Sequence, residues 1–383
     1  MRKWILISTL LGVALLSVGL SLPRHLEASV SPSDGPRAAG ATRAAVPRTG
    51  AAVAGRPAAG NVPPELDAEL ADWFAALMDA PDEADFDHAR SRVFVEMRTQ
   101  IRANPALIKK LEAMLATADR DKPLASLAVG ALAAAGTADA QAALVRLVDR
   151  RKGDVAFLEL LVPTMGFTTR PTPELEGALR RLASSDAPDE VRGMAHLALG
   201  TTVSRLQTDD PARARRIIDA YDAKLARAAS SDELGTYLSV LGNAGTADAA
   251  KVVARYVGDE RGEVRAEALR ALRLVPTDEA QAQLTAALRG DDDGNVRASA
   301  ARALSYRPPT AALAKAEAEA LATERDGGVA KQLLENLWRA HEAAGGEAAL
   351  AAITSAAASH PVAAVRDRAR ALLAEAAPSP PHG

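Results

Sequence analysis

Apolar residues recur every three or four positions through most of this chain, which is the spacing of one face of an α-helix. Val264, Ala268, Leu272 and Val275 form one such stripe, and Leu269 widens it. The next segment carries a second stripe, made of Ala280, Leu284, Ala287 and Leu288. The pattern predicts amphipathic helices that follow one another in pairs, each with a face that must be covered.

Similar short sequences mark three of the turns between these helices. GTADA occurs at 136–140 and again at 245–249, and PTDEA occurs at 276–280. The Gly or Pro ends one helix, and the Thr or acid behind it can cap the next helix by accepting hydrogen bonds from its free N–H groups. A recurring turn predicts a repeated helical hairpin. The predicted turn residues are Gly136, Thr137, Gly242, Asn243, Gly245, Thr246 and Thr277.

A second motif also recurs along the chain: an acid, then Val-Arg, then Ala and Leu at helical spacing. Its copies read DEVRGMAHLAL, DERGEVRAEALRAL, DDDGNVRASAARAL and VAAVRDRARALL. Val264 and Val296 are 32 residues apart, and the 73 residues from Val191 to Val264 correspond to two units. This period is typical of a solenoid, in which each helix pair needs neighbours to bury both of its apolar faces.

The repeat resembles the HEAT repeat. That resemblance implies an all-α fold, a right-handed α–α superhelix of antiparallel helix pairs, and a ladder of acids and arginines between adjacent repeats. The residues that match the ladder pattern are Asp189, Arg192, Asp259, Arg265, Asp292, Arg297 and Arg366. Ala330 replaces the Arg in the unit centred on Val329, so we expect the ladder to be interrupted there.

A second resemblance covers residues 193–275. YLSVLGNAGTADAAKVVARYV followed by EVRAEALRALR is similar to the helical domain of the large lipid transport proteins, vitellogenin and the large subunit of the microsomal triglyceride transfer protein. In that family the helical arch braces β-sheets that enclose lipid. This sequence has no run of alternating strands, so the resemblance implies the brace rather than the lipid cavity.

Composition narrows the classes of function. The chain is rich in Ala and Leu and has five Phe, three Trp and four Tyr, which favours helices over sheets. Cys is absent, which excludes disulfides and thiolate metal sites. A net charge of −3 and few aromatic side chains give no reason to expect nucleic acid. No histidine pair has zinc spacing, and no phosphate-binding or nucleophile motif occurs, so we expect no metal, no cofactor and no enzymatic activity.

The first 28 residues have the features of an export signal. Arg2 and Lys3 precede an apolar run from residue 4 to residue 22, which could be cleaved after Ala28 or retained as a single membrane anchor. Both outcomes place the rest of the chain outside the cytoplasm, in the periplasm or cell envelope. Residues 29–64 have the composition of a disordered Ala/Pro/Gly linker, 65–377 form the predicted solenoid, and 378–383 a disordered tail.

We therefore expect an exported, non-catalytic scaffold that binds a protein partner on the concave face of the solenoid. Membrane contact would then occur only through an uncleaved N-terminal segment. The alternative is a lipid-binding or lipoprotein-assembly component. A scaffold should line its inner face with polar residues, for which Glu267, Arg270, Arg273 and Arg302 are the candidates; a lipid carrier should line it with a large apolar surface.

Overall fold

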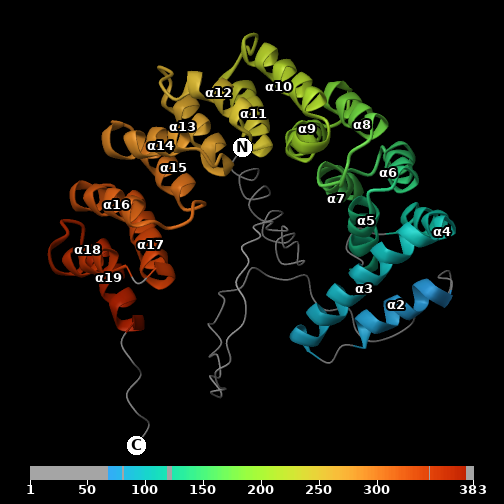
Figure 1. Ribbon diagram of the computed structural model, residues 1–383, viewed down its shortest axis with the longest axis horizontal. Helices are drawn as coiled ribbons and strands as arrows, with labels where there is room; N and C mark the ends of the chain where they lie inside the picture. Colours follow the sequence, from blue (N-terminus) through green and yellow to red (C-terminus); the bar gives the residue numbers. More distant parts are fainter. Residues whose placement is uncertain (1–67, 80–81, 119–122, 345, 377–383) are drawn as a thin grey trace, which may run out of the picture.

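The computed structural model describes residues 68–79, 82–118, 123–344 and 346–376. Within those ranges the chain forms eighteen α-helices and two short 3-10 helices, without a strand. Figure 1 shows them as an open arch of antiparallel pairs that runs from α2 at one end to α19 at the other. The prediction of an all-α solenoid is confirmed. The predicted signal, linker and C-terminal tail lie outside the described residues.

The arch has an inner and an outer layer of helices (Figure 1). The inner layer consists of α3 (Glu83–Ala103), α5 (Pro123–Ala135), α7 (Val155–Gly166), α9 (Asp189–Asp209), α11 (Ser231–Ala244), α13 (Gly262–Ala271), α15 (Gly294–Leu304), α17 (Gly327–Ala344) and α19 (Ala363–Ala376). The outer layer consists of α4 (Pro105–Leu115), α6 (Ala138–Arg150), α8 (Pro173–Ser184), α10 (Pro211–Leu225), α12 (Ala247–Val253), α14 (Asp278–Gly290), α16 (Ala311–Thr323) and α18 (Glu347–Ser359). Helix α2 (Ala68–Met78) packs against α3, and the 3-10 helices η1 (Ala254–Tyr256) and η2 (Leu272–Leu274) extend α12 and α13.

Threonine side chains start several of the outer helices. The hydroxyl oxygen of Thr137 accepts a hydrogen bond from the backbone N–H three residues later at 3.3 Å, and Thr246 and Thr277 do the same at 3.2 Å. Thr172 and Thr310, which the turn motif does not single out, cap α8 and α16 in the same way. Each cap satisfies an N–H group that has no partner inside the helix, which fixes where the helix begins.

Two glycines end the inner helices that precede such caps. Gly136 follows α5 with φ of 70°, and Gly245 follows α11 with φ of 61°. These values lie in the left-handed region, where a side chain costs free energy and glycine does not. The Gly-Thr pair in GTADA therefore stops one helix and starts the next.

The predicted apolar stripes form the core between the two layers. Val264, Ala268, Leu272 and Val275 are all at most 1% exposed, and Leu284 of the following outer helix is fully buried. Burial of each large aliphatic side chain contributes about 1.5–3 kcal/mol to the free energy of unfolding. Because the stripes of one hairpin face its neighbours, the hairpins stabilise one another along the whole arch.

Neighbouring inner helices approach so closely that only glycine fits at several crossings. A Cβ atom at Gly166 would lie 2.9 Å from the backbone of α9, and one at Gly200 would lie 2.2 Å from the backbone of α11. At Gly242 it would lie 2.7 Å from the Cα atom of Ala271 in α13. These distances are shorter than van der Waals contact, so the three glycines set the spacing of the inner layer.

The position of Gly242 corrects the expectation from the sequence. Gly242 and Asn243 do not lie in the turn; both belong to the last turn of α11, and Gly245 alone supplies the helix stop. The LGNAG sequence contains two glycines with different roles, one for packing between helices and one for backbone conformation.

We predict that Gly242→Ala lowers the free energy of unfolding by about 1–3 kcal/mol, because the added methyl group overpacks the contact between α11 and α13. Gly290→Ala is the matched control, since Gly290 ends α14 and a Cβ atom there would meet nothing within 4 Å. Urea denaturation followed by circular dichroism measures both. Equal stability of the two variants would contradict the close approach of the inner helices.

Candidate interaction surfaces

The inner face of the arch is formed by the inward side chains of α9 to α17, and its described part is mainly polar. On α13, one side contacts α11, another contacts α15, and the remaining side carries Glu263, Glu267 and Arg270 at helical spacing. Arg302 on α15 and Lys331 on α17 continue this row and are exposed. The inner face thus resembles ordinary solvated protein surface.

Hydrogen bonds between inner helices order these polar groups. The hydroxyl of Ser231 on α11 donates to Glu263 at 3.0 Å, and Arg270 donates to the hydroxyl of Ser299 on α15 at 3.3 Å. Arg270 also pairs with Glu267 one turn earlier on α13. The side chains are therefore held in position before any partner arrives, which lowers the entropy cost of binding.

One edge of the arch, where the inner helices begin, carries regular charge pairs and is called the ladder edge below. Arg265 donates two hydrogen bonds to the carboxylate of Asp291 in the next repeat, at 2.8 and 2.9 Å. Arg297 forms the same two bonds with Glu324 of the repeat after that, again at 2.8 and 2.9 Å. The third guanidinium nitrogen of each Arg donates to backbone carbonyls of its own repeat. Each arginine thus ties its own turn to the next repeat.

The ladder uses different acids from those expected. Asp259 and Asp292 offer their backbone carbonyls to Arg265 and Arg297, while Asp291 and Glu324 supply the carboxylates. The carboxylate that joins the ladder comes six residues before the arginine of the Val-Arg motif in the same repeat, as Asp291 does before Arg297. Three consecutive aspartates at 291–293 make this spacing impossible to recognise from the sequence.

The two ends of the ladder pattern behave differently from its middle. Arg192 pairs with Asp189 within a single helix turn, at 2.6 Å, so this pair does not link repeats. Arg366 donates to the carbonyls of His360 and Pro361. His360 occupies the position of the ladder acid in the last repeat, six residues before Arg366. Ala330 replaces the Arg of the preceding repeat that would pair with an acid there, and the imidazole of His360 contacts the carbonyl of Leu321 at 3.2 Å.

Asn243 of the LGNAG sequence joins three inner helices. Its side-chain oxygen accepts a hydrogen bond from Arg273 at 2.6 Å, and its side-chain nitrogen donates to the carbonyl of Leu197 in α9 at 3.5 Å. The turn motif predicted only that Asn243 is a turn residue. The observed role depends on the approach of α9 and α13, which sequence alone does not reveal.

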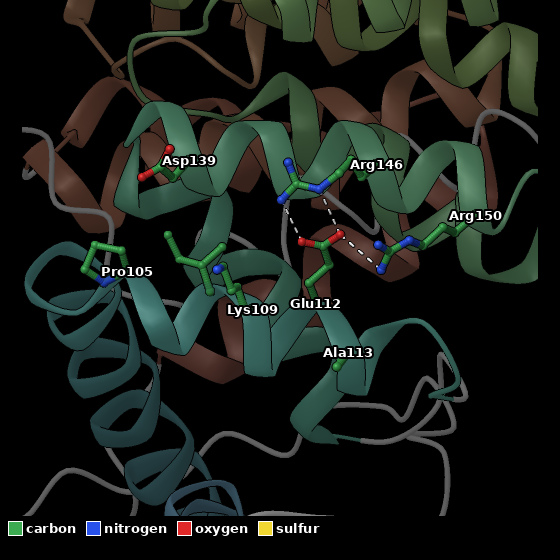
Figure 2. Close-up of a pocket in the computed structure, with 8 residues that line it drawn as sticks. Pro105, Lys109, Glu112, Ala113, Asp139, Arg146 and Arg150 are labelled. Atoms are coloured by element: carbon green, nitrogen blue, oxygen red, sulfur yellow. Dashed lines mark hydrogen bonds and ion pairs between the residues drawn. The ribbon is translucent and has the colours of Figure 1, made fainter.

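A hollow of about 640 Å³ lies on the outer layer between α4 and α6 (Figure 2). Glu112 of α4 sits at its centre and is 5% exposed. Arg146 donates to both of its carboxylate oxygens, at 2.9 and 2.6 Å, and Arg150 lies 3.1 Å away. The hydrogen bond from Arg146 holds the pKa of Glu112 below its usual value against the effect of burial. The charged groups at its centre satisfy one another, so Glu112 and Arg146 tie two repeats together.

An aromatic cluster fills the space between α9, α10 and α11. The imidazole Nδ1 of His196 lies 2.7 Å from the hydroxyl of Tyr221, and the ring of Tyr237 packs edge-on against the imidazole. Burial, reinforced by the positive charges of Lys224 and Arg192, lowers the pKa of His196 to about 4. The imidazole is therefore neutral at neutral pH and packs α10 onto the inner layer. Among the described residues, no group of histidine and acidic side chains could hold a metal ion.

A buried carboxyl group lies between α16 and α17. Glu317 is 1% exposed and accepts a hydrogen bond from the side chain of Asn336 at 2.7 Å. Asn336 also donates to the carbonyl of Ala301 at 2.9 Å. Burial raises the pKa of Glu317 to about 7, although Asn336 and the charge of Arg339 act in the opposite direction.

We predict that Arg297→Ala lowers the free energy of unfolding by about 3 kcal/mol, because it leaves the buried carboxylate of Glu324 without its guanidinium partner. The matched control is Arg289→Ala, whose ion pair with Glu319 is about half exposed on both sides and should be worth about 0–1 kcal/mol. Chemical denaturation compares the two. Equal losses would mean that the ladder is ordinary surface charge.

We predict that Glu317→Gln raises stability at pH 8 and not at pH 4. Since the pKa of Glu317 is raised in the folded state, its carboxyl group stabilises the fold below its unfolded pKa of about 4.5 and loses that contribution as the pH rises through 7. Gln keeps the shape of the protonated acid, so the gain at pH 8 should approach about 3 kcal/mol. Thermal unfolding between pH 4 and 8 measures it. A constant difference across that range would contradict the raised pKa.

Comparison with solved structures gives distant similarities in fold. The crystal structure of an engineered protein is 19% identical, with 79% of this chain and 88% of that chain covered and a TM-score of 0.30. Human deoxyhypusine hydroxylase in complex with glycerol is 21% identical, with 80% and 95% covered and a TM-score of 0.27. At these identities the likeness concerns the fold alone. Among curated proteins, none matches the sequence.

Comparison with protein families gives a match over most of the solenoid. The matching family is described as the vitellogenin TPR domain, and the match covers residues 84–337. It begins in α3 and ends in α17, and it includes the LGNAG sequence and the ladder from Arg265 to Glu324. The chain therefore belongs to the vitellogenin TPR domain family.

Proposed function

We propose that this protein is a non-catalytic scaffold that binds an extended protein segment along the inner face of its arch. The observation that carries the proposal is the row of polar side chains on α11, α13, α15 and α17, which hydrogen bonds order between α11 and α15. Solenoids of helix pairs bind partners through such concave surfaces. The charged groups carry both signs, negative at Glu267 and positive at Arg270 and Arg302, so they suit a polypeptide with mixed polar groups.

The described surface favours a protein partner over a lipid. A lipid carrier needs a continuous apolar surface larger than the few hundred Å² that a soluble monomer exposes. In the described ranges, Val95, Leu274 and Tyr306 are the large hydrophobic side chains that are exposed, and Val95 lies on α3, far along the chain from the other two. Lipoprotein assembly remains the alternative function that the family membership suggests.

We further propose that the scaffold acts outside the cytoplasm. This rests on the sequence of residues 1–28, whose positive start and apolar run are those of an export signal. No helix of the described residues is long and apolar enough to cross a membrane.

Site-specific photo-crosslinking tests the scaffold proposal. We predict that p-benzoylphenylalanine in place of Arg302 or Lys331, both on the inner face, forms a crosslink to the same partner protein in the source cells. The control position is Ala282, which is exposed on outer helix α14. The crosslinked peptides are then identified by mass spectrometry. Crosslinks to lipid, or equal crosslinking from the control position, would contradict the proposal.

A further inference from the structure

Two exposed hydrophobic side chains occupy the same place in consecutive repeats. Leu274 is 46% exposed and Tyr306 is 48% exposed. Each lies ten residues after the buried Val of its repeat, Val264 and Val296, at the edge of the arch where inner helices end. This edge is called the C-terminal edge below. The helix η2, which holds Leu274, packs against both α11 and α15. Tyr306 lies close enough to Arg273, the residue before Leu274, to act electrostatically on its guanidinium group, which places the two hydrophobic side chains along the same edge.

An arginine is adjacent in sequence to each of these side chains. Arg273 precedes Leu274, is half-buried, and donates to the side chain of Asn243 at 2.6 Å and to the carbonyl of Arg270 at 3.2 Å. Arg307 follows Tyr306 and is 8% exposed. It donates to the carbonyl of Leu272 at 3.3 Å, and its Nε–H is buried without a hydrogen-bond partner. The chain thus holds two guanidinium groups under the surface that carries Leu274 and Tyr306.

These two arginines differ from those of the ladder edge in their charge balance. Arg265 and Arg297 each meet a carboxylate from the next repeat. Among the described residues, no carboxylate is within ion-pair distance of Arg273 or Arg307. Glu267, the acid whose charge acts on Arg273, is itself paired with Arg270. Burial lowers the pKa of both arginines.

Backbone carbonyls at the helix ends balance part of the positive charge of Arg273 and Arg307. The C-terminus of an α-helix has a partial negative charge of about half an elementary charge, spread over its free carbonyls. Two full positive charges therefore remain only partly balanced at the ends of α13 and α15. A carboxylate from outside would complete the balance, and a carboxylate matches guanidinium geometry better than other anionic or neutral groups of a polypeptide do.

We propose that the C-terminal edge of α13 and α15 anchors an acidic residue flanked by an apolar residue in the bound protein segment. The half-buried Arg273 donates to the carboxylate, the buried Arg307 adds its positive field, and Leu274 and Tyr306 cover the apolar neighbour. An aromatic side chain beside arginine is the composition that concentrates binding energy in protein interfaces. The inference rests on the proposed function, since it names the chemistry of the segment that the scaffold binds.

Fluorescence polarisation with synthetic peptides tests this anchor on the purified full chain. The probe is a labelled twelve-residue peptide with alternating Asp and Leu, compared with one peptide that has Asn for every Asp and one that has Ser for every Leu. We expect either replacement to weaken binding by about tenfold or more, as the loss of an anchor residue does. We also expect the affinity of the acidic peptide to fall as salt concentration rises.

Protein variants locate the binding. The double variant Leu274→Ser with Tyr306→Ser should bind the acidic peptide about tenfold or more weakly than the unchanged protein does. Arg273→Gln should also bind the acidic peptide more weakly, and the difference in affinity between the acidic and the Asn peptide should become smaller. Val95→Ser is the matched control, because Val95 is equally exposed but lies on α3. Circular dichroism confirms that each variant is folded.

Several outcomes would overturn the anchor. It is wrong if the acidic and Asn peptides bind equally, if none of the peptides binds, or if the double variant binds as the unchanged protein does. In the last case, crosslinks from the inner face would still support the scaffold, and only the anchor would fail. Absence of any crosslinked protein from the inner face would instead contradict the scaffold itself.

Discussion

Every helix pair in this arch has two apolar faces, and only neighbouring pairs can cover them. That requirement determines the rest of the structure, because it forces the hairpins to stack in one direction and leaves free only the inner face, the outer face and the two edges. The inner helices approach one another closely at Gly166, Gly200 and Gly242, where the lack of a side chain lets the backbone contact the next helix directly. This close spacing makes the inner layer shorter than the outer layer, and a stack with one shorter layer curves into an arch.

The two edges of the arch solve the same electrostatic problem in different ways. At the ladder edge, arginines meet both carbonyls and carboxylates, so Arg265 and Arg297 are fully paired within the protein. At the C-terminal edge, Arg273 and Arg307 meet carbonyls and an amide. The first arrangement fixes neighbouring repeats, whereas the second leaves positive charge beside exposed Leu274 and Tyr306. The molecule is thus asymmetric across its edges: carboxylates pair the arginines of the ladder edge, and carbonyls and an amide bond those of the C-terminal edge.

Sequence patterns predicted the features that depend on local spacing. The stripe from Val264 to Val275 and the threonine caps follow from helical periodicity and from hydrogen bonding within a few residues, so both were readable without a structure. The role of Gly242 could not be predicted from the sequence, because it depends on the contact with Ala271 in another helix. The ladder register was missed for a related reason: three adjacent aspartates are equivalent in sequence, and only the approach of Arg265 selects Asp291. The exposure of Tyr306 could not be predicted either, since a hydrophobic residue at the end of a helix can be buried in the core or exposed on the surface.

One measurement distinguishes most directly between the proposed protein-binding scaffold and the alternative of a lipid-binding component. The protein is purified from its native cells, extracted with organic solvent, and the extract is analysed by quantitative mass spectrometry for acyl lipids per chain. A polar inner face, held by contacts such as Ser231 with Glu263, predicts no lipid at a defined ratio. One or more acyl lipids per chain, retained through purification, would contradict the account of the arch as a protein-binding scaffold.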